Sequence, residues 1–324
     1  MNGSSPSADV RELLGRGDDY VRQGDGKTAM VFYQAALKSA QGTSFIEPQT
    51  MERLRAAQAF IQKRATEFQE ALERAFSGTR PASEAAQIRL EHSLEMLKGE
   101  RQIYQQQPSA FYYPYLSQRQ FFEREEFDWV PELERAADSI REELAAVLEE
   151  GADFRPYVES RADRPYRDFH GLNEDPSWTA LYLLRNGKAV EENAKRFPSA
   201  MAALGRVPLT SFGSRTPDAL FSRLEPGAHI PPHTGLLNCR LICHLPLIVP
   251  EGCWLRVGNE KRYWEEGKLL IFDDSMEHEA RNPSDELRII LLFDVWRPEL
   301  TKEERSAMSA VFDAIDQFRG VPEG

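Results

Sequence analysis

Apolar residues recur at three- and four-residue steps from residue 8 to about residue 107, a pattern typical of consecutive helices. One long helix is predicted to end at Gly78 and Pro81, which are common helix terminators. A further helix follows it. The two apolar stripes contain Leu54, Ala57, Ile61, Ala65, Phe68, Leu72 and Ala75, and then Leu90, Leu94, Leu97 and Tyr104.

The first of these helices match the alternation of small and large residues in a helical repeat. The matching positions are Gly17, Tyr20, Ala29, Tyr33 and Ala36, which fit one tetratricopeptide repeat. No clear second copy follows. We therefore interpret residues 1–107 as a tetratricopeptide-like region. It is either a helical scaffold, which we favour, or a groove for a peptide partner.

Residues 105–131 are rich in aromatic side chains and prolines and do not follow a helix pattern. Their rings are Phe111, Tyr112, Tyr113, Tyr115, Phe121, Phe122, Phe127 and Trp129. We expect an irregular segment that wraps around a core, and we place a domain boundary near residue 108. Residues 132–149 again have a helical stripe.

Short apolar segments separated by turn residues dominate the chain from residue 219 onwards. The predicted strands are Ala219–Leu224, Leu241–Val249, Cys253–Val257, Lys268–Phe272 and Leu287–Trp296. Short strands at this spacing favour a sandwich or jelly roll. Thr301 and Glu304 form a capping box that begins a last amphipathic helix. The predicted class is α+β, with a second domain over residues 108–324.

Composition restricts the partners of this chain. Its 324 residues carry a net charge of −12, and 41% are hydrophobic. This acidic balance argues against nucleic acid, because phosphate binding requires a basic surface. No apolar run reaches the length of a membrane span, and the first residues lack a signal-peptide pattern, so we expect a cytoplasmic protein. The three cysteines, Cys239, Cys243 and Cys253, are expected to be buried and unpaired.

Two histidines and an arginine carry the chemistry that the sequence predicts. His233 precedes His278 by 45 residues, and Arg288 follows ten residues later. Two imidazoles can hold Fe(II), and a guanidinium can bind the far carboxylate of 2-oxoglutarate through paired hydrogen bonds. We predict that Arg288 lies on the strand adjacent to His278. His229 is a rival ligand on spacing alone.

The acidic ligand of the usual iron site is missing from its usual position. Iron oxygenases of this type normally use two histidines and one carboxylate. The carboxylate is expected two residues after the first histidine, where this chain has Gly235. Asp273 or Asp274 could compensate by holding a metal-bound water. We favour Asp274 for this catalytic role.

Three segments resemble the aspartyl/asparaginyl β-hydroxylase family. They are residues 233–244, 264–278 and 294–300, and the resemblance extends over roughly residues 108–305. It implies a double-stranded β-helix with His233 and His278 as metal ligands and a glycine in place of the acid. It also implies that Fe(II), 2-oxoglutarate and dioxygen are required. The helical N-terminus resembles the tetratricopeptide-like region found in some members.

The resemblance assigns further roles by position. Arg288 and Ser222 would hold the C5 carboxylate of 2-oxoglutarate, and His244 would contact its C1 carboxylate region. Arg240 would face the substrate. One position departs from the family, because many peptide-hydroxylating members have an arginine where this chain has Ile242. This departure implies either weaker 2-oxoglutarate binding or a substitute basic residue.

The predicted function is therefore a dioxygenase that hydroxylates an unactivated C–H bond and releases succinate and CO2. The expected target is the β-carbon of Asp or Asn in a peptide, protein or small molecule. One alternative is hydroxylation of a lipid acyl chain. Another is a non-catalytic protein that binds a partner through its helices and has a degenerate barrel.

Overall fold

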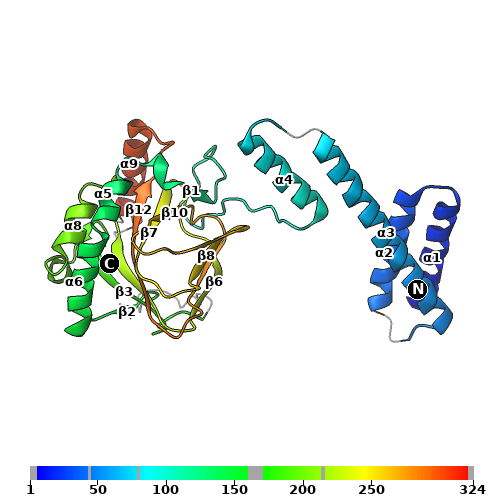
Figure 1. The fold of residues 1–324 in the computed structure, drawn as a ribbon, viewed down its shortest axis with the longest axis horizontal. Helices are drawn as coiled ribbons and strands as arrows, with labels where there is room; N and C mark the ends of the chain where they lie inside the picture. Colours follow the sequence, from blue (N-terminus) through cyan, green and yellow to red (C-terminus); the bar gives the residue numbers. More distant parts are fainter. Residues whose placement is uncertain (1–5, 43–44, 79–80, 160–170, 213–215, 320–324) are drawn as a thin grey trace. The chain divides into compact units, whose positions relative to one another are not determined.

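The computed structural model describes residues 6–42, 45–78, 81–159, 171–212 and 216–319. Contacts divide the chain into two compact units, Met1–Arg101 and Gln102–Gly324. The regular elements described in the first unit are helices, and the described strands belong to the second unit (Figure 1). No described helix is both long and apolar enough to cross a membrane.

The N-terminal unit has α1 (Pro6–Arg22), α2 (Gly26–Gln41), α3 (Pro48–Gly78) and α4 (Glu84–Lys98). Asp25 caps α2 by accepting a hydrogen bond from the Thr28 N–H at 3.0 Å. A Cβ atom on Gly17 would collide with the Tyr33 ring, so this glycine allows α1 and α2 to approach closely. The expected contact between a small and a large residue is present. The tetratricopeptide assignment stays a prediction.

The predicted helix over α3 is present, but its apolar stripe is buried only in the first half. Leu54 and Ala57 pack with α1 and α2 in one core, and Ile61 lies partly buried beside them. Phe68, farther along the same stripe, is 50% exposed. The helical periodicity therefore predicted the element correctly but not the extent of its burial.

The second unit is built around two antiparallel sheets. Its strands are β1 (Phe121–Phe122), β2 (Arg155–Pro156), β3 (Trp178–Arg185), β4 (Lys188–Ala189), β5 (Ala219–Leu224), β6 (His229–His233), β7 (Arg240–Ile248), β8 (Trp254–Val257), β9 (Glu260–Tyr263), β10 (Leu270–Phe272), β11 (His278–Arg281) and β12 (Arg288–Trp296). In the described chain, the larger sheet has the order β1-β10-β7-β12-β5-β3-β2, with β4 beside β3. The smaller sheet has the order β6-β11-β8-β9.

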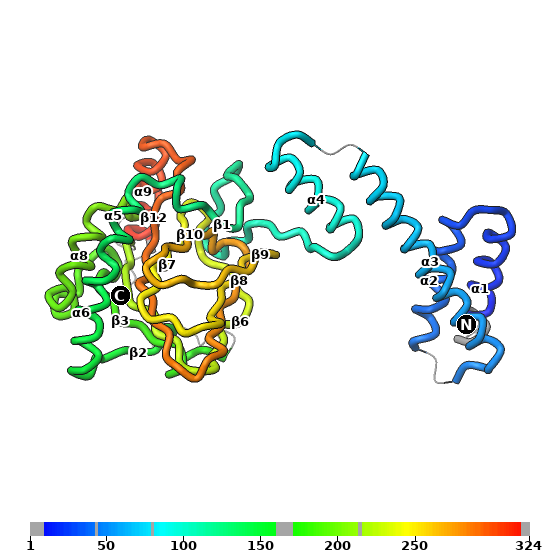
Figure 2. Tube along the Cα trace, in the orientation of Figure 1, coloured from blue at the N-terminus to red at the C-terminus, as the bar shows by residue number. Residues whose placement is uncertain are grey.

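Helices cover the outer face of the larger sheet, and the smaller sheet lies on its other side (Figure 2). The helices of this unit are a short 3-10 turn (Arg124–Glu126), α5 (Val130–Arg135), α6 (Ala137–Glu149), α7 (Glu191–Ala194), α8 (Pro198–Leu204) and α9 (Lys302–Arg319). The result is an α+β unit with the two-sheet sandwich expected of a jelly roll.

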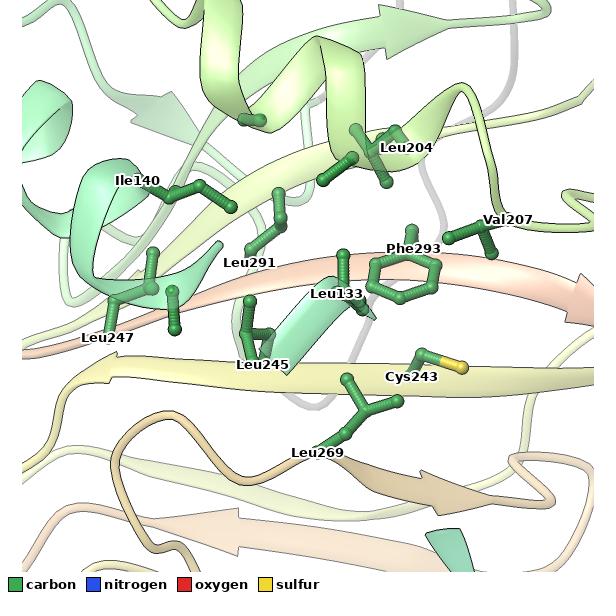
Figure 3. Packing of buried hydrophobic residues seen from close by; sticks show 14 of the residues in the cluster. Leu133, Ile140, Leu204, Val207, Cys243, Leu245, Leu247, Leu269, Leu291 and Phe293 are labelled. Carbon is green, nitrogen blue, oxygen red and sulfur yellow. The ribbon is translucent and has the colours of Figure 1, made fainter. Parts of the chain in front are cut away.

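Alternation along the central strands separates the core from the functional face. Cys243 and Leu245 of β7 and Leu291 and Phe293 of β12 point toward α5, α6 and α8 (Figure 3). Intervening residues such as Ile242 of β7 instead join a second core shared with the smaller sheet. Since both faces are buried, these strands are almost continuously apolar in sequence.

The last helix confirms its predicted start. The Thr301 N–H donates to the Glu304 carboxylate at 2.8 Å, and the Glu304 N–H donates to the Thr301 hydroxyl at 3.2 Å. This is the predicted capping box. Met308 and Phe312 of α9 pack against Trp296 at the end of β12.

Candidate metal and oxo-acid site

A cavity of about 450 Å³ opens between the two sheets. Each residue predicted for the site lines it, namely Ser222, His233, Arg240, His244, Asp274, His278 and Arg288. The larger sheet supplies Ser222, Arg240, His244 and Arg288, from β5, β7 and β12. The two candidate metal ligands come from the smaller sheet, so the cavity combines side chains from both layers.

His233 and His278 are directly opposite each other on paired strands. They are cross-strand partners of β6 and β11, and their ring centroids are 4.1 Å apart. Nδ1 of His233 lies 2.8 Å from the Pro231 carbonyl, and Nδ1 of His278 lies 3.0 Å from the Met276 carbonyl. A carbonyl only accepts hydrogen bonds, so each Nδ1 carries the proton and each Nε2 carries the lone pair suited to a metal.

Burial keeps His278 in the neutral form that a metal requires. It lowers the pKa of this imidazole to about 4. In the described part of the chain, no cluster of three or more His, Cys, Asp or Glu side chains could hold a metal. The donors present are two imidazoles that both direct Nδ1 at a backbone carbonyl, which fits a divalent iron bound by two protein ligands through Nε2.

Asp274 occupies the space that a side chain on residue 235 would need. A Cβ atom on Gly235 would collide with the Asp274 carboxylate. The Gly235 N–H donates to the Asp274 carbonyl at 2.6 Å, which fixes the two segments together. Oδ1 of Asp274 is buried and has no hydrogen-bond partner among the described residues. The carboxylate missing after His233 is therefore replaced in space by one that precedes His278.

Arg288 is a buried cation without a carboxylate partner among the described side chains. It is 1% exposed, and it donates to the Ser222 carbonyl at 3.2 Å and to its hydroxyl at 3.4 Å. Its guanidinium carbon lies 4.9 Å from the centre of the Trp264 ring. Burial lowers the pKa of Arg288 to about 10. Such a group is suited to bind a carboxylate from a ligand.

One expectation about Arg288 was wrong. It does not lie on a strand adjacent to that of His278, because β12 pairs with β5 and β7, whereas β11 pairs with β6 and β8. The chain crosses from one sheet to the other between the two residues. Arg288 and His278 consequently face the same cavity from opposite layers.

Arg240 is held by carboxylates within the chain. Its guanidinium lies 3.2 Å from the Asp274 carboxylate and 3.3 Å from that of Asp294. To bind a substrate as predicted, Arg240 would have to keep one or both of these ion pairs while it contacts the substrate.

His244 lies on the same face of β7 as Arg240 and Ile242. It is buried, and burial lowers its pKa far below the usual value.

The rival ligand His229 is at the other end of β6. It lies 2.7 Å from the Glu279 carboxylate, and its side chain is 39% exposed.

Residues outside the predicted set also shape the cavity. Trp178 lines it beside Tyr157, with stacked rings 4.1 Å apart, and Trp178 donates to the Ser222 hydroxyl at 3.2 Å. No pattern in the sequence pointed to Tyr157.

The profile of the aspartyl/asparaginyl beta-hydroxylase family matches residues 134–298. The chain belongs to this family. The match includes both histidines, Arg288 and every strand of the cavity. The human aspartyl/asparaginyl beta-hydroxylase is 39% identical over 184 residues, which are 56% of this chain and 23% of the human protein.

A second family relative has a different printed function. The ornithine lipid ester-linked acyl 2-hydroxylase of Rhizobium tropici is 38% identical over 175 residues, which cover 53% of this chain and 58% of that protein. Among solved structures, a Pseudomonas putida prolyl-4-hydroxylase aligns with 50% of this chain and 88% of its own at 16% identity. Its TM-score of 0.30 is too low to assign a fold.

Proposed function

We propose that this chain is an Fe(II)- and 2-oxoglutarate-dependent dioxygenase that hydroxylates an unactivated C–H bond. The β-carbon of an Asp or Asn residue is the favoured target. One observation carries the proposal. Two imidazoles, each with Nδ1 directed at a backbone carbonyl and Nε2 left to face a metal, share a cavity with Arg288, a buried cation that has no carboxylate partner among the described residues. Family membership supports the same activity.

When bound, iron and 2-oxoglutarate supply the oxidising chemistry. Dioxygen would be the oxidant, with one oxygen atom entering the substrate and the other entering succinate as CO2 is released. His233 and His278 would hold the metal through Nε2. Arg288 and the Ser222 hydroxyl would hold the distal carboxylate of 2-oxoglutarate, and the Asp274 carboxylate would accept a hydrogen bond from a water on the metal.

The protein's own contribution is orientation and the exclusion of water. Arg240 holds Asp274 by a hydrogen bond of 3.2 Å, so that one oxygen of the carboxylate is directed and the other remains to accept. Apolar side chains from both sheets, including Ile230, Leu255 and Leu292, line the same cavity. They would keep solvent from the target C–H bond.

Anaerobic titration with Fe(II) and 2-oxoglutarate tests the proposal. A weak visible charge-transfer band is expected with the native protein. It should weaken with Arg288→Ala, and His278→Ala should remove it. Absence of the band in folded native protein would refute the assignment. Succinate release in the presence of a substrate peptide is the second measurement.

A lipid acyl chain is the second candidate substrate. The apolar cavity walls and the Rhizobium tropici relative favour it. Hydroxylation of an acyl chain, with no turnover of Asp- or Asn-containing peptides, would select this candidate. We also propose that the helical region over residues 1–107 is a tetratricopeptide-like scaffold.

A further inference from the structure

A buried hydrogen-bonded cluster lies next to the two segments that carry the histidines. At its centre, Oδ2 of Asp273 accepts hydrogen bonds from Nε2 of Gln106 at 2.6 Å and from Nη1 of Arg297 at 2.7 Å. Asp273 and Arg297 are fully buried, and Gln106 is 7% exposed. We call these three residues the anchor cluster. They are distinct from the residues that line the cavity.

On one side, the anchor cluster fixes the turn that leads to His278. Oδ1 of Asp273 accepts hydrogen bonds from the backbone N–H and the hydroxyl of Ser275, at 3.0 and 2.5 Å. The Ser275 carbonyl accepts from the Gln107 N–H at 2.7 Å. Asp274 lies between Asp273 and Ser275, so its backbone is restrained at both neighbours.

On the other side, the anchor cluster reaches the segment that follows His233. Oε1 of Gln106 accepts a hydrogen bond from Nδ2 of Asn238 at 2.9 Å. Nη1 of Arg297 donates to the Asn238 carbonyl at 3.4 Å. Asn238 is completely buried. The Gln106 side chain and Arg297 therefore both link the segment after His233 to the turn before His278.

The geometry points to Gln106 as a positioning residue for the metal site, acting through the anchor cluster. This inference rests on the proposed metal site. Two imidazoles from separate strands bind one ion well only if their spacing is maintained. The pairing of β6 with β11 sets this spacing, and the described residues offer no third ligand to reinforce it. Partners in the outer shell of a metal site typically change metal affinity about 10–100-fold when they are removed.

Mn(II) binding to the metal-free full-length protein tests this inference without requiring turnover. Free Mn(II) is measured by electron paramagnetic resonance. Gln106→Met removes the amide at similar volume and should weaken Mn(II) binding about tenfold, the low end of the usual range, because the backbone bonds of Gln107 remain. Thermal unfolding of the metal-free variant reports separately on structural loss.

Asn259→Ala is the matched control. The Asn259 side chain bonds the backbone of Gln102 at 3.2 and 2.8 Å, so it holds the same segment without reaching either histidine. Native affinity for Mn(II) is expected in this variant. If it weakens binding as much as Gln106→Met does, Gln106 has no specific positioning role and the inference is wrong.

Arg297→Lys is a second variant, which disrupts the anchor cluster at a different residue. If Gln106→Met does not fold, Mn(II) binding by Arg297→Lys tests the inference in its place. If the native protein binds Mn(II) tightly and the affinities of both folded variants change by less than about twofold, the inference is wrong while the proposed metal site stands. No binding by the native protein would overturn the proposed metal site, and the inference with it.

Discussion

Replacing Arg288 with methionine should stabilise the ligand-free protein while it removes 2-oxoglutarate binding. Arg288 is 1% exposed and has no carboxylate partner among the described residues. Its burial therefore opposes folding unless an anion arrives. Methionine has a similar length and no charge. The substitution therefore separates the contribution of this residue to the site from its effect on the fold.

The size of the effect can be worked from the pKa. Burial lowers the pKa of Arg288 to about 10. At about 1.36 kcal/mol per pH unit, this reduction corresponds to a penalty of about 3 kcal/mol on the charged form. Its hydrogen bonds to Ser222 and its contact with Trp264 offset part of any gain on removal. We expect Arg288→Met to raise the free energy of unfolding by about 1–2 kcal/mol.

Thermal and urea unfolding, with and without 2-oxoglutarate and Mn(II), is the assay. In the native protein the ligand should raise the melting temperature, and in Arg288→Met it should have no effect. Arg297→Met is the matched control. Arg297 is equally buried but lies 2.7 Å from the Asp273 carboxylate, so its removal should cost about 3–5 kcal/mol. Lower stability of ligand-free Arg288→Met, or retained 2-oxoglutarate binding, would refute the reasoning.

Three other experiments test the same cavity. The pKa of His278 is about 4 in the folded state and 6.5 ordinarily, so stability should fall by up to about 3 kcal/mol as the pH falls from 6.5 toward 4. Urea unfolding of metal-free His278→Gln should lack this loss, and an unchanged pH dependence in the variant would contradict the reasoning. Gly235→Asp should weaken Mn(II) binding because the new side chain collides with Asp274, and adding Asp274→Gly should recover the affinity. If the two substitutions instead weaken Mn(II) binding additively, the carboxylates at positions 235 and 274 do not compete for one volume. Ile242→Arg should strengthen 2-oxoglutarate binding about tenfold in calorimetry, since it adds a cation to the cavity, and unchanged affinity would count against the assigned orientation.

The strands that the sequence predicted best are those buried on both faces. The predicted Ala219–Leu224 agrees with β5, and the predicted Leu287–Trp296 agrees with β12 to within one residue. Both runs are largely apolar because one face meets the helices and the other meets the cavity. The sequence pattern failed for β6, whose Pro231 and Pro232 argue against a strand. These prolines are tolerated because β6 is at the edge of the smaller sheet.

Long-range pairing explains what the sequence could not show about the site. The order of His233, His278 and Arg288 identified a candidate set because each position stands at a strand end or start. Nothing local revealed that Arg240 pairs with Asp274 and Asp294, since these partners are 34 and 54 residues away. The same limit hid the anchor cluster, in which Gln106 and Asp273 are separated by 167 residues.

The position of Asp274 explains how a glycine can follow the first histidine without leaving the site devoid of acid. A carboxylate on residue 235 and the carboxylate of Asp274 would compete for one volume. Arg240 holds Asp274 in that volume, and the Gly235 N–H fixes its backbone. In the proposed site, an acid that approaches from the turn before His278 would serve a metal-bound water, and the two imidazoles would be the protein's contacts to the metal. The glycine is therefore a steric requirement of this arrangement, and its loss should affect the site even where it adds a potential ligand.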